Sequence, residues 1–414
     1  MTHLLLAATS LDVTPPPGHR LDGYAARTAT AAGTADPLRA TLIWLSTAND
    51  PGVLWLTLDA IAVGAELTAE LSAAAGRAAG IPAAHVVVSA SHTHSGPSGW
   101  TGQIHPVIPA EREADLYEPL ISAVANAVLD REAVVASWRS VEVTGVGTNR
   151  HRADGPHDNT AGVLALHSPA GSLRAVLLDF ACHPTTYGPE NLLYSADWPG
   201  AARAALGPAV VGYLQGAAGD VSPRFTRQGR GAAEITRLGE LLASRVREAL
   251  AGPGLELPQV APTIRRTTVR LPVRSLPATE DAAAIVRASE RAIHGGVEDP
   301  SARIAQTRLD GARGQARMAA VELPVELELP VSVVTLGDVC WVNLPVELFA
   351  LHGAVLQERS SYPITRVVGY TDGYFGYVVD PAAAEAGVYE ALITYFDQPT
   401  TDQLLTETAT FVNS

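Results

Sequence analysis

The sequence predicts an α/β fold in which a mixed β-sheet forms the core and helices pack outside it. Residues 53–58, 66–80 and 85–90 read as an apolar run, an Ala-rich helical pattern and a β-branched run. This strand, helix, strand order is typical of an α/β unit. Apolar runs at 162–168 and 173–183 flank the turn sequence PAGS, which predicts a hairpin. Together, the strand–helix–strand unit and the hairpin predict a mixed sheet.

The first half of the chain adds further strands and one more helix. Residues 4–14 form a strand-like run that is ended by three consecutive prolines. A polar loop with the sequence LDGYAAR leads to a second run at 38–46, which the turn sequence NDPG joins to the run at 53–58. Residues 110–132 carry a helical pattern, and 140–152 read as a strand that runs into a polar loop.

The second half alternates in the same way. Strands are expected at 208–216, 263–273, 325–336 and 339–345, and helices at 200–206, 232–250 and 279–320, the last split in two near Gly295-Gly296. Another helix is expected to begin near Glu347, and a final one follows the Tyr- and Gly-rich segment 366–379. The Pro- and Gly-rich stretch 251–262 is the best candidate for an internal subdivision of one large domain.

Composition excludes several classes of function. The chain has 414 residues and a net charge of −14, which disfavours nonspecific binding to nucleic acid or to an anionic membrane. All 29 basic residues are arginine, so lysine Schiff-base chemistry is excluded. The two cysteines, Cys182 and Cys340, stand in no CxxC pattern, which excludes a disulfide framework or a cysteine–zinc site. The sequence has no secretory signal and no membrane-spanning run, which predicts a cytoplasmic protein, and its Ala, Arg and Gly bias suggests a bacterial source.

Histidines stand at the ends of two predicted strands. His92 and His94 directly follow one apolar run, and His183 ends another, just before a proline. In an extended chain residues i and i+2 point to the same side, so His92 and His94 can face one cavity. A catalytic zinc needs further ligands beside histidine, and Glu347 is the candidate carboxylate. The alternative is that the histidines are ordinary loop residues and that Glu347 complements a helix dipole.

A glycine-rich loop, GAAGDVSPR at 216–224, follows another predicted strand. It presents Ser222 and lets backbone approach a ligand, although a plain strand-to-helix turn has the same composition. It contains no GxxxxGK[ST] pattern, so it is not a phosphate-binding loop. The sequence also lacks a GxSxG elbow, which disfavours a Ser-His-Asp hydrolase.

These motifs together resemble the neutral, or non-lysosomal, ceramidases, a family of zinc amidases. HTHSGPSG resembles the family signature HTHSGPGG, AAGDVSPR matches its AGDVSPN loop, and LDGYA is similar to its MGYA segment. FACHPTT with SADWPG resembles the second-histidine region, LPVELFALHG the glutamate segment, and GYFGYVV with YEA the YVTT…YEG segment. The resemblance covers nearly all of residues 1–414. It implies a single zinc-hydrolase-type catalytic domain without the C-terminal immunoglobulin-like domain of the secreted ceramidases.

The resemblance also implies one Zn²⁺ per chain and a role for each site residue. The implied zinc ligands are His92, His183, Glu347 and Tyr377. The implied catalytic residues are His94 as general base or acid, Tyr389 as stabiliser of the oxyanion with help from Arg150, and Ser222 as a hydrogen-bond partner of the substrate. Zinc would activate a water molecule as the nucleophile.

The sequence departs from the family in ways that bear on the substrate. Arg224 stands where the family has Asn, and NRHR stands where the family has an NRSP-like segment, which leaves the role of Arg150 open. Because the extra domain and a signal peptide are missing, we expect a small soluble N-acyl compound of bacterial secondary metabolism rather than membrane ceramide. Neither nucleic acid nor a stable membrane contact is expected as a partner.

Three alternatives to amide hydrolysis stay open. The same zinc site can serve an acyltransferase or a cyclase if its pocket excludes water. A binding or scaffold protein without catalysis is the second, although every implied ligand position keeps a competent side chain. A metal-dependent esterase or phosphatase is the third, and it is disfavoured because no Arg cluster for phosphate is evident.

Overall fold

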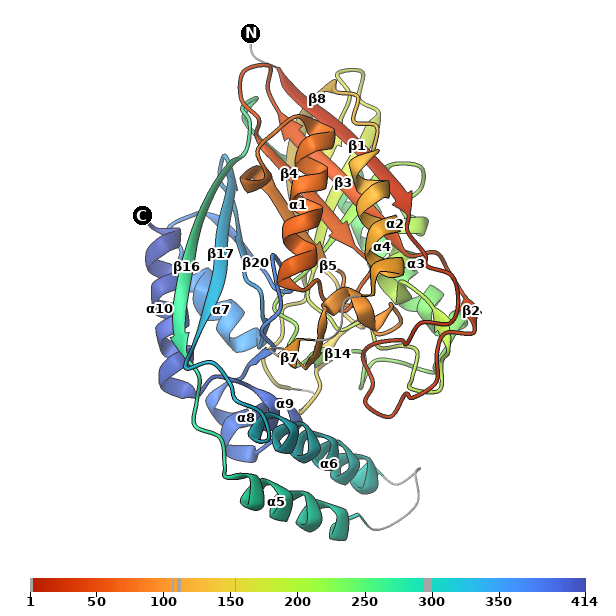
Figure 1. Cartoon of the computed structure of the whole chain (residues 1–414). Helices are drawn as coiled ribbons and strands as arrows, with labels where there is room; N and C mark the ends of the chain where they lie inside the picture. Colours follow the sequence, from red (N-terminus) through yellow and green to blue (C-terminus); the bar gives the residue numbers. More distant parts are fainter. Residues whose placement is uncertain (1–2, 106–107, 110–112, 153, 294–299) are drawn as a thin grey trace.

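The computed structural model describes residues 3–105, 108–109, 113–152, 154–293 and 300–414. Two β-sheets lie at the centre, and helices lie outside them (Figure 1). The predicted α/β class, with a mixed sheet core and helices packed outside, is confirmed. Among the described residues, no helix combines the length and the apolar character that crossing a membrane would require.

The larger sheet has nine strands in the order β13-β11-β10-β8-β1-β3-β4-β5, with β15 paired to β8. Its strands are β1 (Leu4–Asp12), β3 (Arg39–Ser46), β4 (Val53–Leu58), β5 (Val86–Ala90), β8 (Glu132–Glu142), β10 (Thr160–His167), β11 (Leu173–Phe180), β13 (Val210–Gln215) and β15 (Leu255–Glu256). Neighbours pair antiparallel except at the two ends, where β4 with β5 and β11 with β13 are parallel. A helix separates the two strands of each parallel pair in the chain, as such crossovers require.

The two ends of the larger sheet come together in space. β13 packs across β3, β4 and β5. Gly212 in β13 permits this approach, because a Cβ there would lie 3.0 Å from Ile43 Cδ1. Gln215, at the end of β13, donates from Nε2 to Ser91 O at 3.4 Å, just beyond β5. Strand ends from opposite edges of the sheet are therefore neighbours.

A second sheet of four strands, in the order β16-β17-β18-β20, connects these ends. Its strands are β16 (Thr263–Pro272), β17 (Glu326–Leu336), β18 (Val339–Asn343) and β20 (Ile364–Val368). Beyond β20 the chain passes between β13 and β5. Gly369 N donates to Gln215 O at 3.0 Å, and Ala90 N donates to Tyr370 O at 3.0 Å.

Short strands and outer helices complete the fold. The two-stranded pairs are β2 (Gly33–Thr34) with β12 (Leu193–Tyr194), β9 (Thr148–Asn149) with β14 (Val221–Ser222), β19 (Glu347–Leu348) with β21 (Tyr377–Val378), and β6 (Gln103–His105) with β7 (Ile108–Pro109). The α-helices are α1 (Ala65–Ala79), α2 (Ala114–Ala125), α3 (Asp197–Ala205), α4 (Ala232–Ala251), α5 (Thr279–Arg291), α6 (Pro300–Ala319), α7 (Ala350–Arg359), α8 (Pro381–Ala386), α9 (Tyr389–Ile393) and α10 (Gln398–Val412).

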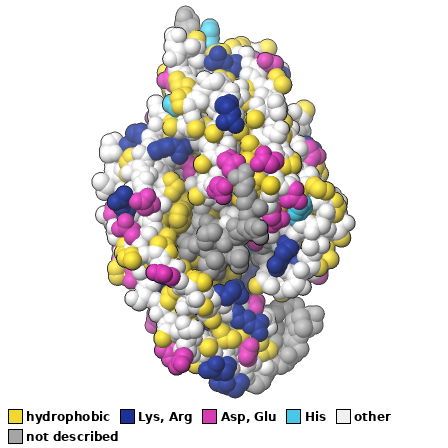
Figure 2. Space-filling view, viewed as in Figure 1, with side chains coloured by type: hydrophobic (Ala, Val, Ile, Leu, Met, Phe, Trp, Pro, Cys, Tyr) yellow, Lys and Arg dark blue, Asp and Glu magenta, His cyan; other side chains and the backbone are white. Residues whose placement is uncertain are grey.

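The helices pack in pairs around the sheets. α1 packs on α2, α3 on α4, and α10 contacts both α7 and β16. α5 and α6 form a hairpin at the lower end of the molecule in Figure 1, and α6 packs on α9. On the face shown in Figure 2, Arg and Asp or Glu side chains are interspersed, with apolar side chains between them.

Most predicted elements are present, but three boundaries were wrong. The helix expected near Glu347 begins at Ala350, because Glu347 lies in β19, which pairs in parallel with β21. The helix predicted for 110–132 ends at Ala125, since Asn126 terminates it by donating from Nδ2 to the carbonyl of the preceding turn. β8 consequently begins earlier than the predicted strand at 140–152.

Two predictions on chain organisation have separate outcomes. The helices predicted on either side of Gly295-Gly296 are present as α5 and α6, but the break itself and residues 110–112 lie outside the described residues. The subdivision at 251–262 stays a prediction, although β15 within this stretch pairs with β8.

The two sheets share an apolar core around three tryptophans. Trp341 of β18 is fully buried, and its ring lies edge-on to Trp55 of β4 at 5.8 Å and to Trp138 of β8 at 5.5 Å between centroids. Such aromatic pairs contribute about 0.5–1.5 kcal/mol beyond the area that they bury. This contact therefore fixes the smaller sheet against the larger one.

Replacing Trp341 by alanine should lower the free energy of unfolding by about 3–5 kcal/mol, because it leaves a cavity between the sheets. Val128→Ala, at a side chain that is 72% exposed, should change it by less than about 0.5 kcal/mol. Denaturant unfolding followed by circular dichroism measures both. Equal effects of the two substitutions would contradict a core centred on Trp341.

Candidate active site

His92 and His94 lie in the loop beyond β5. His92 has a left-handed backbone with φ 67°. Both side chains are buried, and their Nε2 atoms lie 3.4 Å apart. The two rings do meet, edge-on with centroids 5.0 Å apart, but the alternation of an extended chain was the wrong reason, because the backbone turns at His92.

Backbone carbonyls fix the tautomers of His92 and His183. His92 Nδ1 lies 2.7 Å from Ile61 O, and His183 Nδ1 lies 2.7 Å from Ala218 O. Since a carbonyl oxygen only accepts, each Nδ1 carries a proton, and in the neutral ring Nε2 then presents a lone pair. Burial, with Arg150 and His92 nearby, lowers the pKa of His183 to about 4, so this ring is neutral at pH 7.

Three buried acceptor atoms converge at one point. Glu347 Oε2 lies 3.1 Å from His92 Nε2 and 3.2 Å from His183 Nε2. When both rings are neutral and carry their proton at Nδ1, no proton lies between these atoms. In the described part of the chain His183 Nε2 has no hydrogen-bond partner. A cation at this point would satisfy all three groups, and nitrogen and carboxylate donors are those that zinc prefers. The donor set therefore fits a metal ion.

Tyrosines from the segment after β20 surround Glu347. β19 pairs with β21 in parallel register, which sets Glu347 beside Tyr377. Tyr374 Oη donates to Glu347 Oε1 at 2.5 Å, and Tyr370 Oη donates to Oε2 at 3.4 Å. Tyr370 and Tyr374 were not predicted from the sequence as site residues. Their signal was the repeated tyrosine of GYTDGYFGY, in which only the last tyrosine matched the family pattern.

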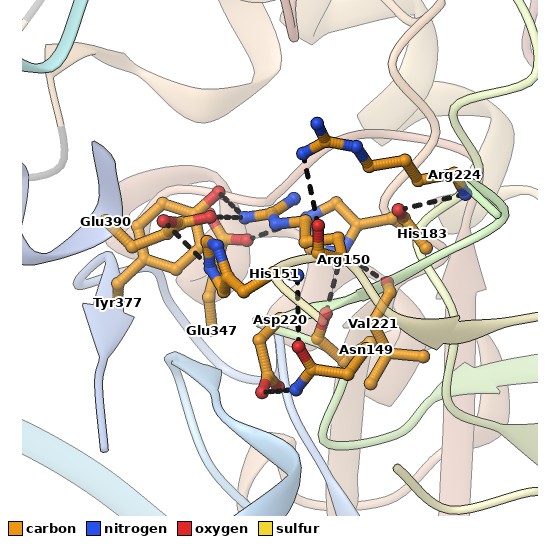
Figure 3. Close-up of polar contacts among 12 residues, drawn as sticks. Asn149, Arg150, His151, His183, Asp220, Val221, Arg224, Glu347, Tyr377 and Glu390 are labelled. Atoms are coloured by element: carbon orange, nitrogen blue, oxygen red, sulfur yellow. Dashed lines mark hydrogen bonds and ion pairs between the residues drawn. The ribbon is translucent and has the colours of Figure 1, made fainter. Parts of the chain in front are cut away.

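Arg150 joins the site through Tyr377 and Glu390 (Figure 3). Its Nη2 donates to Tyr377 Oη at 3.3 Å and forms an ion pair with Glu390 Oε1. His151 Nε2 lies 3.3 Å from Glu390 Oε2. Burial alone would raise the pKa of Glu390, but Arg150 and His151 lower it to about 2. The guanidinium is thus paired with a carboxylate inside the protein.

The glycine-rich loop at 216–224 is where the segments of the site are joined. Asp220 Oδ2 accepts from Asn149 Nδ2 at 2.6 Å, and its Oδ1 accepts from Ala350 N at 2.8 Å. Asp220 O accepts from Arg150 N, and Val221 O accepts from His183 N. The segments that carry Arg150, His183 and Glu347 are therefore all held by residues 218–221 of this loop. Gly219 is needed there, since a Cβ would lie 2.5 Å from Glu347 O.

The loop between β1 and β2 forms a wall against His94. A Cβ on Gly23 would lie 2.5 Å from His94 Cγ. The Tyr24 ring meets the His94 ring edge-on, with centroids 5.2 Å apart. Arg27 is buried and donates from Nη1 to His94 O and to Asp22 O, both at 2.8 Å. This loop therefore fixes the position of the His94 ring.

The other residues proposed from sequence lie close by. Tyr389 opens α9, and its ring centroid lies 6.2 Å from that of Tyr377. Ser222 is buried in β14, where its Oγ accepts from Arg224 N at 3.3 Å. The structure thus brings His92, His94, His183, Glu347, Tyr377 and Arg150 together, with Tyr389 and Ser222 on neighbouring elements.

Two further features outside this site are accounted for by internal contacts. A cavity of about 230 Å³ beside α7 is lined by Asp158, Gln357 and Arg366, but Arg366 there is paired with Asp158 and Asp179. His19 directs Nδ1 to Glu113 and Nε2 to Asp115. Exposed acidic groups such as these are common without a metal ion.

Comparison with known proteins gives the fold. The neutral ceramidase from Pseudomonas aeruginosa superposes with a TM-score of 0.76 and 16% identity, over 99% of this chain and 74% of that chain. A ceramidase complexed with C2 superposes with a TM-score of 0.76 and 15% identity, over 100% of this chain and 74% of that one. No family model and no curated protein sequence matches the chain. The chain has the neutral ceramidase fold, as the sequence motifs predicted.

Gly23→Ala should displace the His94 ring and lower kcat by about 10²-fold, the typical effect of a misplacement of about 1 Å. Gly18→Ala is the matched control. Gly18 lies in the same loop with a left-handed φ of 118°, like the 102° of Gly23, but a Cβ there would touch nothing. Both variants should lose stability through the positive φ, Gly23→Ala more because of its contact with His94, and only Gly23→Ala should lose turnover. Equal kcat values for the two would contradict the role of this wall.

Proposed function

We propose that this protein is a zinc-dependent amidohydrolase that cleaves the amide bond of a small soluble N-acyl compound. The observation that carries the proposal is the meeting of His92 Nε2, His183 Nε2 and Glu347 Oε2 at one buried point. Burying such groups without a partner costs several kcal/mol. A bound cation removes that cost, and the ceramidase fold supports amide chemistry at this position.

One zinc ion per chain would be held by His92, His183, Glu347 and Tyr377. Bound there, zinc would polarise the amide carbonyl and lower the pKa of a water molecule. Carbonyl contacts at both Nδ1 atoms hold the two histidine rings in the tautomer that a metal needs. The enclosure of the carboxylate by Tyr370 and Tyr374 keeps Glu347 in place.

His94 supplies the proton transfer. Burial, with His92 and His183 close by, holds the pKa of His94 well below its usual range, so the ring is neutral and accepts a proton at pH 7. In the reaction, Nε2 takes a proton from the attacking water. The carbon–nitrogen bond of the amide then breaks, and His94 delivers the proton to the leaving amine nitrogen.

Hydroxyl groups from two elements bind the substrate. Burial raises the pKa of Tyr389, so its phenol stays protonated and donates to the carbonyl oxygen as negative charge develops there. Ser222 hydrogen-bonds the amide or a hydroxyl of the substrate. Arg150 supports the site by donating from Nη2 to the phenol oxygen of Tyr377. A cytoplasmic location and a place in bacterial secondary metabolism stay predictions from the sequence.

Acyl transfer or cyclisation is the second candidate function, and the burial of the site favours it. His92 and Glu347 are each 1% exposed, and His183 is not exposed at all. A site closed to bulk water allows an amine or hydroxyl to replace water as the acceptor.

Metal analysis of the purified protein should find about one zinc per chain. His92→Ala should lose the metal, because it removes one of the two histidine ligands and leaves His183, Glu347 and Tyr377. His94→Ala should keep the metal and lose about 10²–10⁴-fold in kcat, the usual contribution of a general base. A metal-free His92→Ala protein with wild-type turnover would refute the proposal.

Products separate hydrolysis from transfer. With an N-acyl substrate and increasing amounts of a free amine, a hydrolase should release the same amount of acid throughout. An acyltransferase should form new amide in proportion to the amine, as measured by mass spectrometry. His94→Ala should abolish either product.

A further inference from the structure

We propose that Glu390 is a positioning residue that sets the guanidinium of Arg150 against the phenol oxygen of Tyr377. The proposal rests on the proposed function, because it takes Tyr377 as a metal ligand. It assigns to Glu390 and His151 a role that none of the sequence motifs gave them.

The contacts form a continuous chain of polar groups. Glu390 is 2% exposed, and its Oε1 forms an ion pair with Arg150 Nη2. The same Nη2 donates to Tyr377 Oη at 3.3 Å. The order is carboxylate, guanidinium, phenol, as Figure 3 shows. Because Nη2 carries two hydrogens, it can serve both oxygens at once.

The backbone fixes the positions of Arg150 and Tyr377 but not the direction of the guanidinium. Arg150 N is held by Asp220 O at 2.7 Å, and Tyr377 is held by the β19–β21 pair. A guanidinium on a flexible stem still needs a partner to choose its direction. Glu390 is that partner, and a buried carboxylate without Arg150 would cost several kcal/mol, so the two hold each other.

His151 is the second residue that lies beside the same carboxylate. Its Nε2 lies 3.3 Å from Glu390 Oε2, and its ring stacks on Phe349 with centroids 6.1 Å apart. Phe349 follows Glu347 by two residues. The carboxylate therefore ties α9, which also carries Tyr389, to the segment with Glu347.

This pairing decides what Arg150 does. Its positive charge is matched by Glu390 inside the protein, so Arg150 acts on the reaction through Tyr377 and not as a free cation for a substrate anion. Glu390→Gln keeps the shape of the side chain and removes the charge that orients the guanidinium. Tyr377 then loses its defined donor.

The test compares zinc affinity and turnover in matched variants. Glu390→Gln should weaken zinc binding about 10–100-fold in a competition with a chelator, the usual effect of losing a partner of a metal ligand. It should lower kcat by a similar factor with little change in KM. In Glu390→Ala, added formate should restore part of the kcat, because it can occupy the emptied carboxylate position beside Arg150.

Glu234→Gln is the control for the loss of a buried carboxylate–arginine pair. Glu234 is 6% exposed and is paired with Arg237 in α4. This variant should keep the zinc affinity and kcat of the wild type. Wild-type zinc affinity in Glu390→Gln would overturn the proposal, and so would an equal loss in Glu234→Gln. A wild type that binds zinc but hydrolyses no amide would remove the proposed reaction, and weaker zinc binding in Glu390→Gln would still support the role of Glu390.

Discussion

The site depends on one constraint, which is that the two ends of the larger sheet are held side by side. The passage of Gly369 and Tyr370 between β13 and β5 does this through one backbone hydrogen bond on each side. His92 follows β5 at one of these ends, and His183 follows β11, the neighbour of β13 at the other. Glu347 and Tyr377 lie in the paired strands β19 and β21, and Tyr370 of the connecting stretch donates to Glu347 Oε2. The connection that closes the sheet therefore also assembles the ligand set.

The sequence predicted the parts of the fold that local patterns encode. The strand–helix–strand unit and both hairpins follow from apolar periodicity and turn residues within short windows. The meeting of opposite sheet edges has no such pattern, because it depends on contacts between residues that are far apart, such as Gln215 with Ser91. The helix start at Glu347 was misplaced for the same reason, since its strand partner is Tyr377.

Much of the candidate site was also accessible from the sequence. His92, His183 and Glu347 were found because strand ends and a family resemblance point to the same positions. Gly23, Asp220 and Glu390 were not assigned a role. Each of them contacts a residue that is distant in sequence. Gly23 lies against His94, Asp220 accepts from Asn149, and Glu390 pairs with Arg150. A carboxylate beside a recognised tyrosine, as in VYEA, was the one available signal for Glu390.

The wide separation of the ligands along the chain has a consequence for how the protein matures. The first proposed ligand is residue 92 and the last is residue 377, so the site forms only after segments far apart in the sequence have come together. Of the four non-glycine residues with positive φ in the described chain, His92 and Tyr370 lie in this site, and such strain persists only when surrounding structure imposes it. A nascent or proteolysed chain that ends before β19 would hold both proposed histidine ligands and still lack the carboxylate. Metal uptake would thus report that the whole chain has folded, which makes zinc a check on completeness as well as a source of chemistry.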